Sequence, residues 1–273
     1  MRNKEYGIWI EKSYEKSAMD MSSSHSHSCY ELYFLLSGER RYLVGHKIYN
    51  VKPGELVIIP KKELHRTTSL NNNGYERYVV YFSESCLDGI VDIIGQGRCN
   101  EFLQSGCVAL QPECISKIKS LLAIIAKECE KGDTLSEAIT LNALQGIILS
   151  AMRYGMPKDR NTKDGADKIQ EVTQYISENY ALDITLASVA EMAFMEETYF
   201  SKKFKKLTGF GFKEYLIRTR IRAAEKLLLT SHLTISAVSD RCGFSGSNYF
   251  GDAFKHYTGY SPSEYVRKKR GRE

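Results

Sequence analysis

The sequence predicts an α+β protein in which a β-barrel followed by two helices precedes an all-helical region. Three observations lead to this fold class. Short alternating apolar runs separated by turn residues fill the first 110 residues. From Pro112 the apolar residues recur three or four positions apart, which is typical of amphipathic helices. In the second half, a 17-residue motif occurs twice at an offset of fifty residues.

Composition sets outer bounds on the class of protein. The chain has 273 residues, 42% of them hydrophobic, which is enough for more than one domain. It contains neither a run of eighteen apolar residues nor a signal-peptide pattern, so we expect a soluble, cytoplasmic protein. The seven cysteines include no Cys-x-x-Cys pair, which argues against a disulfide framework and a zinc knuckle.

The first predicted domain, residues 1–110, is a barrel. Its runs ELYFLL, RYLVG, ELVIIP and RYVVYF are separated by SG, KPGE, KKE and NNNG, which predicts strands and turns from about Gly7 to Leu110. Two amphipathic helices joined at Lys-Gly-Asp are expected in residues 111–154, on the apolar positions Ile115, Ile118, Leu121, Leu122, Ile125, Leu135, Ile139, Leu144, Ile147, Ile148 and Ala151. We expect these helices to pair between two chains and so to form a homodimer, and packing on the barrel itself is the alternative. The polar residues 155–166 then read as an interdomain linker.

The repeat lies in the basic part of the chain, residues 167–273. Residues 1–157 hold 18 basic and 18 acidic side chains, whereas residues 158–273 hold 20 and 15, so the whole excess of +5 is in the second part. The two copies, YFSKKFKKLTGFGFKEY and YFGDAFKHYTGYSPSEY, agree at 8 of 17 positions. A basic surface of this kind is compatible with binding to phosphates.

Each copy of the repeat forms the second half of a predicted helix-turn-helix (HTH) unit, one at about 186–207 and one at about 235–257. In the second unit the helix is expected to break at Gly243, with Ser245 capping the next helix. Residues 212–230 hold no Gly or Pro and predict a helix that connects the units. The aromatic residues of both second helices are expected to face inward as core: Tyr199, Phe200, Phe204, Tyr249, Phe250 and Phe254.

The opposite face of each second helix is the candidate DNA-binding surface. It carries small polar and basic side chains that suit base edges and phosphates: Thr198, Ser201, Lys202, Lys205, Ser247, Asn248, Gly251, Asp252 and Lys255. Two such units on one chain predict contacts with two major-groove segments one helical turn apart.

The segment GFSGSNYFGDAFKHYTGYSPSEY, Gly243 to Tyr265, resembles the signature of the AraC/XylS family of bacterial transcription regulators. The resemblance covers about residues 167–269. It implies a double helix-turn-helix DNA-binding domain, double-stranded promoter or operator DNA as the partner, possible contact with RNA polymerase and, for an N-terminal domain, control by a small-molecule effector. The first unit departs from the pattern, because Phe194 stands where a small turn residue is usual and because Glu196 and Glu197 open its recognition helix.

The N-terminal region resembles the two cupin motifs, in His25-x-His27-x-x-x-Glu31 and in Gly54-x5-Pro60-x4-His65. This resemblance implies a barrel whose interior binds a small molecule, with a sugar or related polar metabolite as one class of effector. The candidate pocket residues are His25, His27, Glu31, Tyr33, Arg41 and His65. We expect no cofactor and no catalytic residues, but a metal-dependent cupin enzyme with a DNA-binding tail remains the alternative function.

Overall fold

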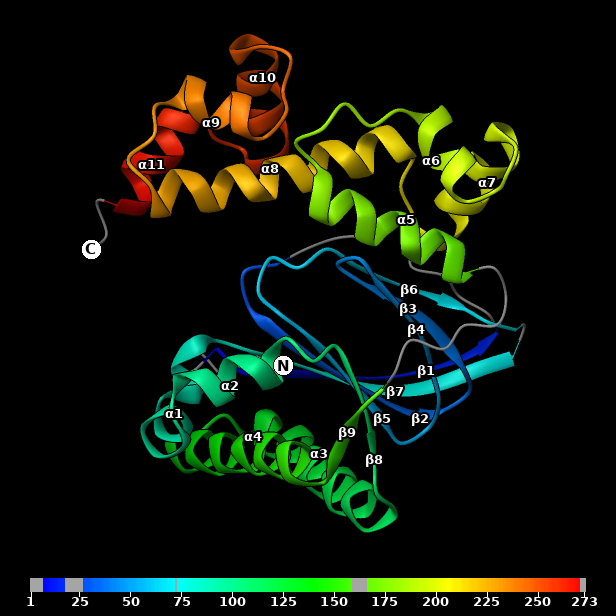
Figure 1. Cartoon of the computed structure of the whole chain (residues 1–273). Helices are drawn as coiled ribbons and strands as arrows, with labels where there is room; N and C mark the ends of the chain where they lie inside the picture. Colours follow the sequence, from blue (N-terminus) through cyan, green and yellow to red (C-terminus); the bar gives the residue numbers. More distant parts are fainter. Residues whose placement is uncertain (1–6, 18–26, 72, 159–165, 271–273) are drawn as a thin grey trace. The chain divides into compact units, whose positions relative to one another are not determined.

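The computed structural model describes residues 7–17, 27–71, 73–158 and 166–270. The chain divides into two compact units, Met1–Lys163 and Asp164–Glu273 (Figure 1).

The described part of the first unit contains two antiparallel sheets. The six-stranded sheet has the order β1-β7-β2-β5-β8-β9, and the three-stranded sheet has the order β4-β3-β6. The strands are β1 (Trp9–Ser17), β2 (Tyr30–Ser37), β3 (Arg40–Val44), β4 (Lys47–Val51), β5 (Glu55–Ile59), β6 (His65–Ser69), β7 (Asn73–Phe82), β8 (Cys107–Leu110) and β9 (Gly155–Pro157).

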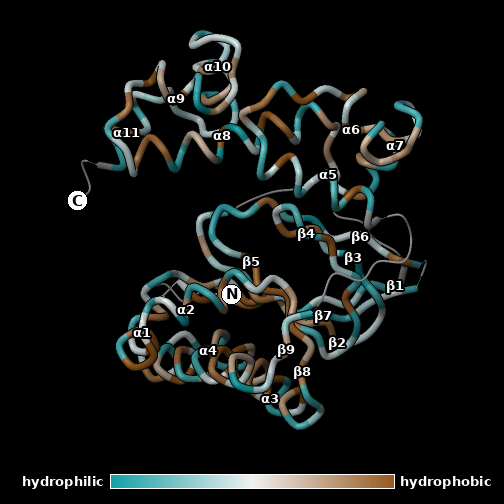
Figure 2. Tube along the Cα trace, viewed as in Figure 1, coloured by the Kyte–Doolittle hydropathy of each residue, from teal (hydrophilic) through white to brown (hydrophobic). Residues whose placement is uncertain are grey.

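Alternation along β2 assigns its residues to two separate cores. Leu32 and Phe34 join the cluster that includes the buried residues of the helices, whereas Tyr33 and Leu35 join a cluster formed between the two sheets. Because successive side chains of a strand point to opposite faces, both faces of this central strand are buried. Apolar residues accordingly concentrate along the middle strands of the six-stranded sheet (Figure 2).

The helices α3 (Pro112–Lys131) and α4 (Thr134–Tyr154) confirm the predicted helix pair. Gly132 ends α3 in the left-handed region at φ 70°, and the Asp133 carboxylate caps α4 by accepting from the Ser136 amide. Between β7 and β8 the structure adds the short helices η1 (Glu84–Leu87), α1 (Asp88–Ile94) and α2 (Gln96–Leu103), where the sequence predicted only strands and turns.

The apolar faces of α3 and α4 cover the chain's own sheet. Ile118, Leu122 and Ile125 are at most 1% exposed and belong to the same cluster as Leu32 and Phe34. Most of the apolar face that we expected to form a dimer interface is therefore buried within one chain. Helix α4 is long and apolar enough to cross a bilayer by length and composition alone, but its buried residues lie in this core.

The second unit is helical throughout its described residues. Its helices are α5 (Ala166–Asn179), α6 (Leu186–Met192), α7 (Glu197–Thr208), α8 (Phe212–Thr230), α9 (Ile235–Arg241), α10 (Ser247–Thr258) and α11 (Pro262–Arg270). The pairs α6–α7 and α9–α10 are the two predicted helix-turn-helix units, and α8 is the predicted connecting helix (Figure 1).

Residues that are identical in the two copies of the repeat have the same structural roles. Thr208 and Thr258 each donate their hydroxyl to the carbonyl four residues earlier, and the glycine after each ends the helix in the left-handed region. The tyrosine that closes each copy stands edge-on to a buried phenylalanine, with ring centroids 5.4 Å apart for Tyr215 and 5.3 Å apart for Tyr265. The identities are thus those of caps and core.

The turns inside the two units differ by one residue. Phe194 and Gly243 both adopt positive φ, 55° and 76°, and each is followed by a residue whose amide bonds back to the preceding helix. The first unit needs one further residue to reach the next helix and the second needs two. The predicted cap at Ser245 is wrong, because the extra residue makes Gly246 the N-cap of α10.

The first residues of the predicted linker belong to the first unit instead. Gly155–Pro157 form β9, which pairs with β8, and Lys158 contacts the carboxylate of Glu55 at 2.7 Å. The predicted linker had no apolar periodicity, but main-chain pairing at a sheet edge requires none. Residues 159–165 lie outside the described residues.

Candidate functional site

The recognition helices α7 and α10 expose the side chains predicted to face DNA. Six of them are exposed on the surface of the second unit, Ser201 and Gly251 are half-buried, and the buried side of each helix is formed by phenylalanines: Phe200, Phe204, Phe250 and Phe254. Asp252 is the remaining candidate and is also exposed. The helical period therefore separates a core face from a solvent face in both units.

Tyr199 and Tyr249 are a correction to the predicted core. They are 55% and 44% exposed, whereas the phenylalanine after each is fully buried. A residue one position from a core residue is rotated by about 100° around the helix, so it lies at the edge of the buried face. Both tyrosines thus belong to the exposed side of their units, next to the candidate DNA-binding side chains.

The two recognition helices begin differently. The Glu196 carboxylate caps α7 by accepting from the amides of Thr198 and Tyr199, both at 2.9 Å. These main-chain hydrogen bonds hold the pKa of Glu196 below its ordinary value. Helix α10 begins at Gly246, which supplies no side-chain cap. An incoming phosphate would therefore meet a carboxylate at the start of α7 and main-chain amides at the start of α10.

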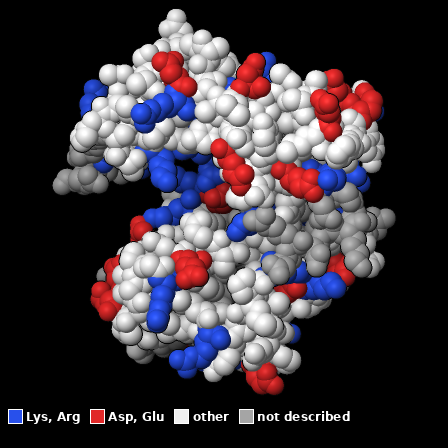
Figure 3. All heavy atoms as spheres, viewed as in Figure 1, with Lys and Arg blue, Asp and Glu red and all other residues white. Residues whose placement is uncertain are grey.

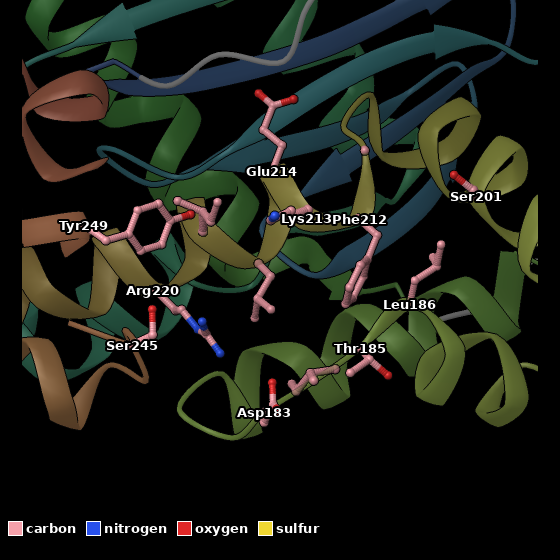
Figure 4. A pocket seen from close by; sticks show the side chains of 14 residues that line it. Asp183, Thr185, Leu186, Ser201, Phe212, Lys213, Glu214, Arg220, Ser245 and Tyr249 are labelled. Atoms are coloured by element: carbon pink, nitrogen blue, oxygen red, sulfur yellow. The ribbon is translucent and has the colours of Figure 1, made fainter. Parts of the chain in front are cut away.

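A groove of about 930 Å³ lies between the two helix-turn-helix units. Figure 4 shows Ser201 of α7 and Tyr249 of α10 at opposite sides of it, with Phe212 and Arg220 of α8 between them. Arg220 also fixes one wall, because it donates to the carbonyls of Tyr180 and Leu182, each at 2.8 Å. Two recognition helices on one rigid connecting helix thus border a common concave surface.

Charge alone does not mark the DNA-binding face. On the face of the molecule shown in Figure 3, Lys and Arg side chains are interspersed with Asp and Glu. The excess of +5 in the chain is small, so net charge alone does not single out a phosphate-binding surface.

In the first unit, four of the predicted pocket residues face the interior between the sheets. His27 Nε2 lies 2.9 Å from Glu31 Oε2, and His65 Nε2 lies 3.4 Å from the same oxygen. Tyr42 donates its hydroxyl to Glu31 Oε1 at 3.1 Å, and the ring of Tyr33 packs against that of Tyr42 at 4.8 Å. Tyr42 was not among the predicted pocket residues, although its ring lies against Tyr33 across the two sheets.

Glu31 is only 2% exposed and is kept charged by its neighbours. Burial by itself raises the pKa of the Glu31 carboxyl, but the hydrogen bonds and charges of His27 and His65 outweigh burial and hold the pKa well below its ordinary value. Burial by itself lowers the pKa of His65, but the hydrogen bond to Glu31 and the charge of that carboxylate outweigh burial, so the pKa of His65 is raised. The cluster is a compact polar centre between the two sheets.

Two other buried groups of this interior have unpartnered polar atoms. Among the described residues, neither the Tyr33 hydroxyl nor Arg40 Nη2 has a hydrogen-bond partner, although both side chains are at most 1% exposed. Arg40 donates through Nε to Thr67 and through Nη1 to Ser69, and its guanidinium lies over the Tyr75 ring at 4.1 Å. Leaving such atoms unpaired is costly, so a polar group placed between the sheets would find hydrogen-bonding partners in them.

The two remaining predicted pocket residues are Arg41 and His25. Arg41 points to the other face of β3 from Tyr42 and donates to Asn50 Oδ1 at 3.2 Å, so it does not reach the cluster. The sequence does not reveal how β3 pairs with its neighbours, so it could not show on which face of β3 Arg41 lies. His25 lies outside the described residues.

Comparison with known proteins bears directly on both units. Residues 11–144 match the model of an AraC-like ligand binding domain, and residues 189–268 match that of a helix-turn-helix domain. The chain belongs to the AraC family of transcriptional regulators. This confirms the resemblance drawn from the Gly243 to Tyr265 segment.

Curated relatives are described as regulators. The uncharacterized HTH-type transcriptional regulator YijO of Escherichia coli is 40% identical over 133 residues, which are 48% of this chain and 47% of that protein. The regulatory protein PocR of Salmonella typhimurium is 31% identical over 130 residues, 48% of this chain and 41% of that protein. The chain thus spans about half or less of the length of these curated relatives.

Two solved structures are similar to parts or most of this chain. The DNA-binding domain of AdpA, solved in complex with a target DNA, is 29% identical and covers 39% of this chain and 96% of its own, with a TM-score of 0.38. ToxT from Vibrio cholerae is 15% identical and covers 95% of this chain and 97% of its own, with a TM-score of 0.38.

Proposed function

We propose that this AraC-family regulator binds DNA sequence-specifically by placing α7 and α10 in two successive major-groove segments. The observation that carries this proposal is the equivalence of the two units: the same helical positions are exposed in both, within one compact unit. Helix α8, with 19 residues, is about 28 Å long, close to the ~34 Å that separates successive major-groove faces.

Nuclease footprinting on a promoter library tests the proposal. The intact chain should protect two groove segments about 10 bp apart on one face of the duplex, and residues 164–273 expressed alone should do so as a monomer. Protection of a single segment would contradict the two-unit arrangement. Failure to select any specific site from the library would contradict sequence-specific binding itself.

The candidate DNA-binding side chains divide into two roles. Ser247 and Asn248 begin α10, whereas Ser201 and Lys202 lie in the middle of α7. These four are proposed as base readers, with Thr198, Gly251 and Asp252 beside them. Lys205 and Lys255 stand further along and are proposed as phosphate contacts. The groove bordered by Ser201 and Tyr249 would then face the DNA backbone between the two segments.

Replacing Lys205 or Lys255 by alanine is expected to weaken binding to all DNA sequences alike. Each lost phosphate contact should reduce the slope of log K against log salt by about 0.9, because fewer counterions are released on binding. Lys226→Ala is the matched control, since this exposed lysine lies on α8 and not on a recognition helix. Binding titrations between 50 and 200 mM salt measure the slopes. An unchanged slope for both variants would remove these lysines from the interface.

The first unit is proposed to bind a small polar effector between its sheets. The unpartnered atoms of Tyr33 and Arg40 and the Glu31 cluster support a ligand with hydrogen-bonding groups, of which a sugar is one class. A thermal-shift screen of small metabolites tests this, because a ligand that prefers the native state raises Tm. The family descriptions and the curated relatives favour this regulatory function over the metal-dependent enzyme.

We also propose that the chain acts in the cytoplasm and that RNA polymerase is a possible protein partner. The other proposed protein partner is a second copy of the chain, which would form a homodimer. The substitutions that test the homodimer must avoid Leu121, which packs on Gly146, and Ile125, which is fully buried. Ile124 and Leu149 are 41% and 44% exposed on α3 and α4 and are the better positions.

Ile124→Glu together with Leu149→Glu is expected to convert a dimer into a folded monomer, because a charge at an apolar interface must be desolvated without a partner. Sedimentation velocity at tens of micromolar measures the mass. Ile93→Glu is the matched control, since this residue is 85% exposed and lies on α1, outside the helix pair. A wild-type monomer, with and without ligand, would end the dimer proposal.

A further inference from the structure

Two arginines of the connecting helix α8 each link a segment that adjoins the first helix-turn-helix unit to a segment of the second. Arg218 and Arg220 are two positions apart, so their side chains leave α8 about 200° from one another, on nearly opposite faces. Both recognition helices pack on α8. Contacts made by these two side chains therefore affect how α7 and α10 are set relative to each other.

Arg218 lies close to one aromatic ring beside each recognition helix. Its guanidinium carbon is 4.7 Å from the ring centroid of Phe210, in the turn that follows α7, and 4.6 Å from that of Tyr257, in the last turn of α10. The Glu214 carboxylate accepts from Arg218 Nε at 3.1 Å and orients the guanidinium. A planar guanidinium has two faces on which aromatic rings can stack, whereas an ammonium group has none.

Arg220 makes a corresponding link on the other face of α8. Figure 4 shows its side chain pointing away from α8, and its Nε and Nη2 donate to the main-chain carbonyls of Tyr180 and Leu182, each at 2.8 Å. These two residues belong to the connection between α5 and α6, directly before the first helix-turn-helix unit. The same guanidinium lies 5.9 Å from the ring of Phe244, in the turn between α9 and α10 of the second unit.

The angle between the two recognition helices matters because DNA is itself a helix. One additional base pair between the two groove segments moves the second segment by about 3.4 Å along the duplex and rotates it by about 35°. To read such a site, α10 would have to turn by a similar angle relative to α7. Side chains that link the two units on opposite faces of α8 oppose this rotation in either direction.

We propose that Arg218 and Arg220 are positioning residues that fix the angle between the two helix-turn-helix units and so restrict this regulator to DNA sites of one spacing. The inference rests on the proposed binding to two groove segments. It concerns the interval between the segments and not the bases that are read, so the exposed side chains of α7 and α10 keep the roles proposed for them.

Binding of the intact chain to a set of duplexes tests the proposal. The set contains the site selected by footprinting, versions with one base pair inserted or removed between the segments, and a version with one segment scrambled. Wild type should lose at least about tenfold in affinity for each change of spacing, as for an unfavourable base pair. Arg218→Ala and Arg220→Ala should lose less than about threefold, because the units can then rotate, and should bind the scrambled duplex as wild type does.

Two further variants separate positioning from charge. Arg218→Lys keeps the charge but loses the planar guanidinium, so it should show the same relaxed spacing dependence as Arg218→Ala. Lys226→Ala removes a charge from an exposed position of the same helix and should behave as wild type. If the arginines contacted phosphates instead, each alanine variant would bind every duplex more weakly and would lower the salt slope by about 0.9, which would overturn the proposal.

Failure of this inference can be distinguished from failure of two-segment binding. A wild-type chain that binds the scrambled duplex as tightly as the selected site would contradict both. A strong spacing dependence in wild type that both alanine variants retain would overturn the inference alone. If circular dichroism shows that Arg220→Ala does not fold, Arg218→Ala decides the matter, since the Arg218 side chain is 31% exposed and contacts side chains rather than the main chain.

Discussion

Asn248→Ala is expected to lower affinity for the preferred DNA site by about 1–3 kcal/mol, which is about 5–150-fold, while non-specific affinity changes much less. The side chain is exposed near the start of α10, where recognition helices contact base edges. An asparagine amide offers a donor and an acceptor together, so it can bond both polar atoms of an adenine edge. Gel-shift titrations on the selected site and on a scrambled duplex measure the two affinities.

Lys202→Ala, in the recognition helix of the first unit, is expected to lose less. The Glu196 carboxylate occupies the amides that begin α7 and repels a nearby phosphate, which should keep this helix further from the groove. Lys226→Ala again removes one exposed lysine outside the recognition helices and should leave the specific affinity nearly unchanged. A larger loss for Lys202→Ala than for Asn248→Ala would reverse the proposed order of the two units. Equal losses on both duplexes would show that neither residue reads bases.

Gly243→Ala is expected to destabilise the second unit by about 3 kcal/mol, within the upper range of single substitutions. Gly243 has φ 76°, a conformation that costs other residues about 1–2 kcal/mol. A methyl group there would also stand 2.4 Å from the main-chain oxygen of Ala181, so the backbone of the α5–α6 connection would have to move.

Gly259→Ala separates the two causes. Gly259 also has positive φ, 80°, but a methyl group there meets nothing within 4 Å, so only the conformational cost applies. Denaturation followed by far-UV circular dichroism measures the loss of helix in each variant. Fluorescence of Trp9, the single tryptophan, reports on the first unit and should show an unchanged transition. Equal destabilisation by the two substitutions would mean that the Ala181 contact relaxes without cost.

The sequence by itself determined the second unit almost completely. The repeat, the Thr-Gly pairs and the apolar period predict helix ends and a buried face, because caps and helical periodicity depend on residues within a few positions of one another. Gly243 was predicted at its turn for the same reason. Ser245 was misplaced as a cap, since a difference of one residue in turn length is set by how the next helix packs.

Tertiary structure alone decided which surfaces the apolar and polar residues of the first unit face. Periodicity predicted the apolar faces of α3 and α4, but only packing shows that residues such as Ile125 cover the chain's own sheet. Tyr199 and Tyr249 were assigned to the core because a one-dimensional pattern cannot show where a buried face ends. His27, Glu31 and His65 converge because two sheets face each other, and a contact between strands distant in sequence leaves no local pattern that would reveal its distances.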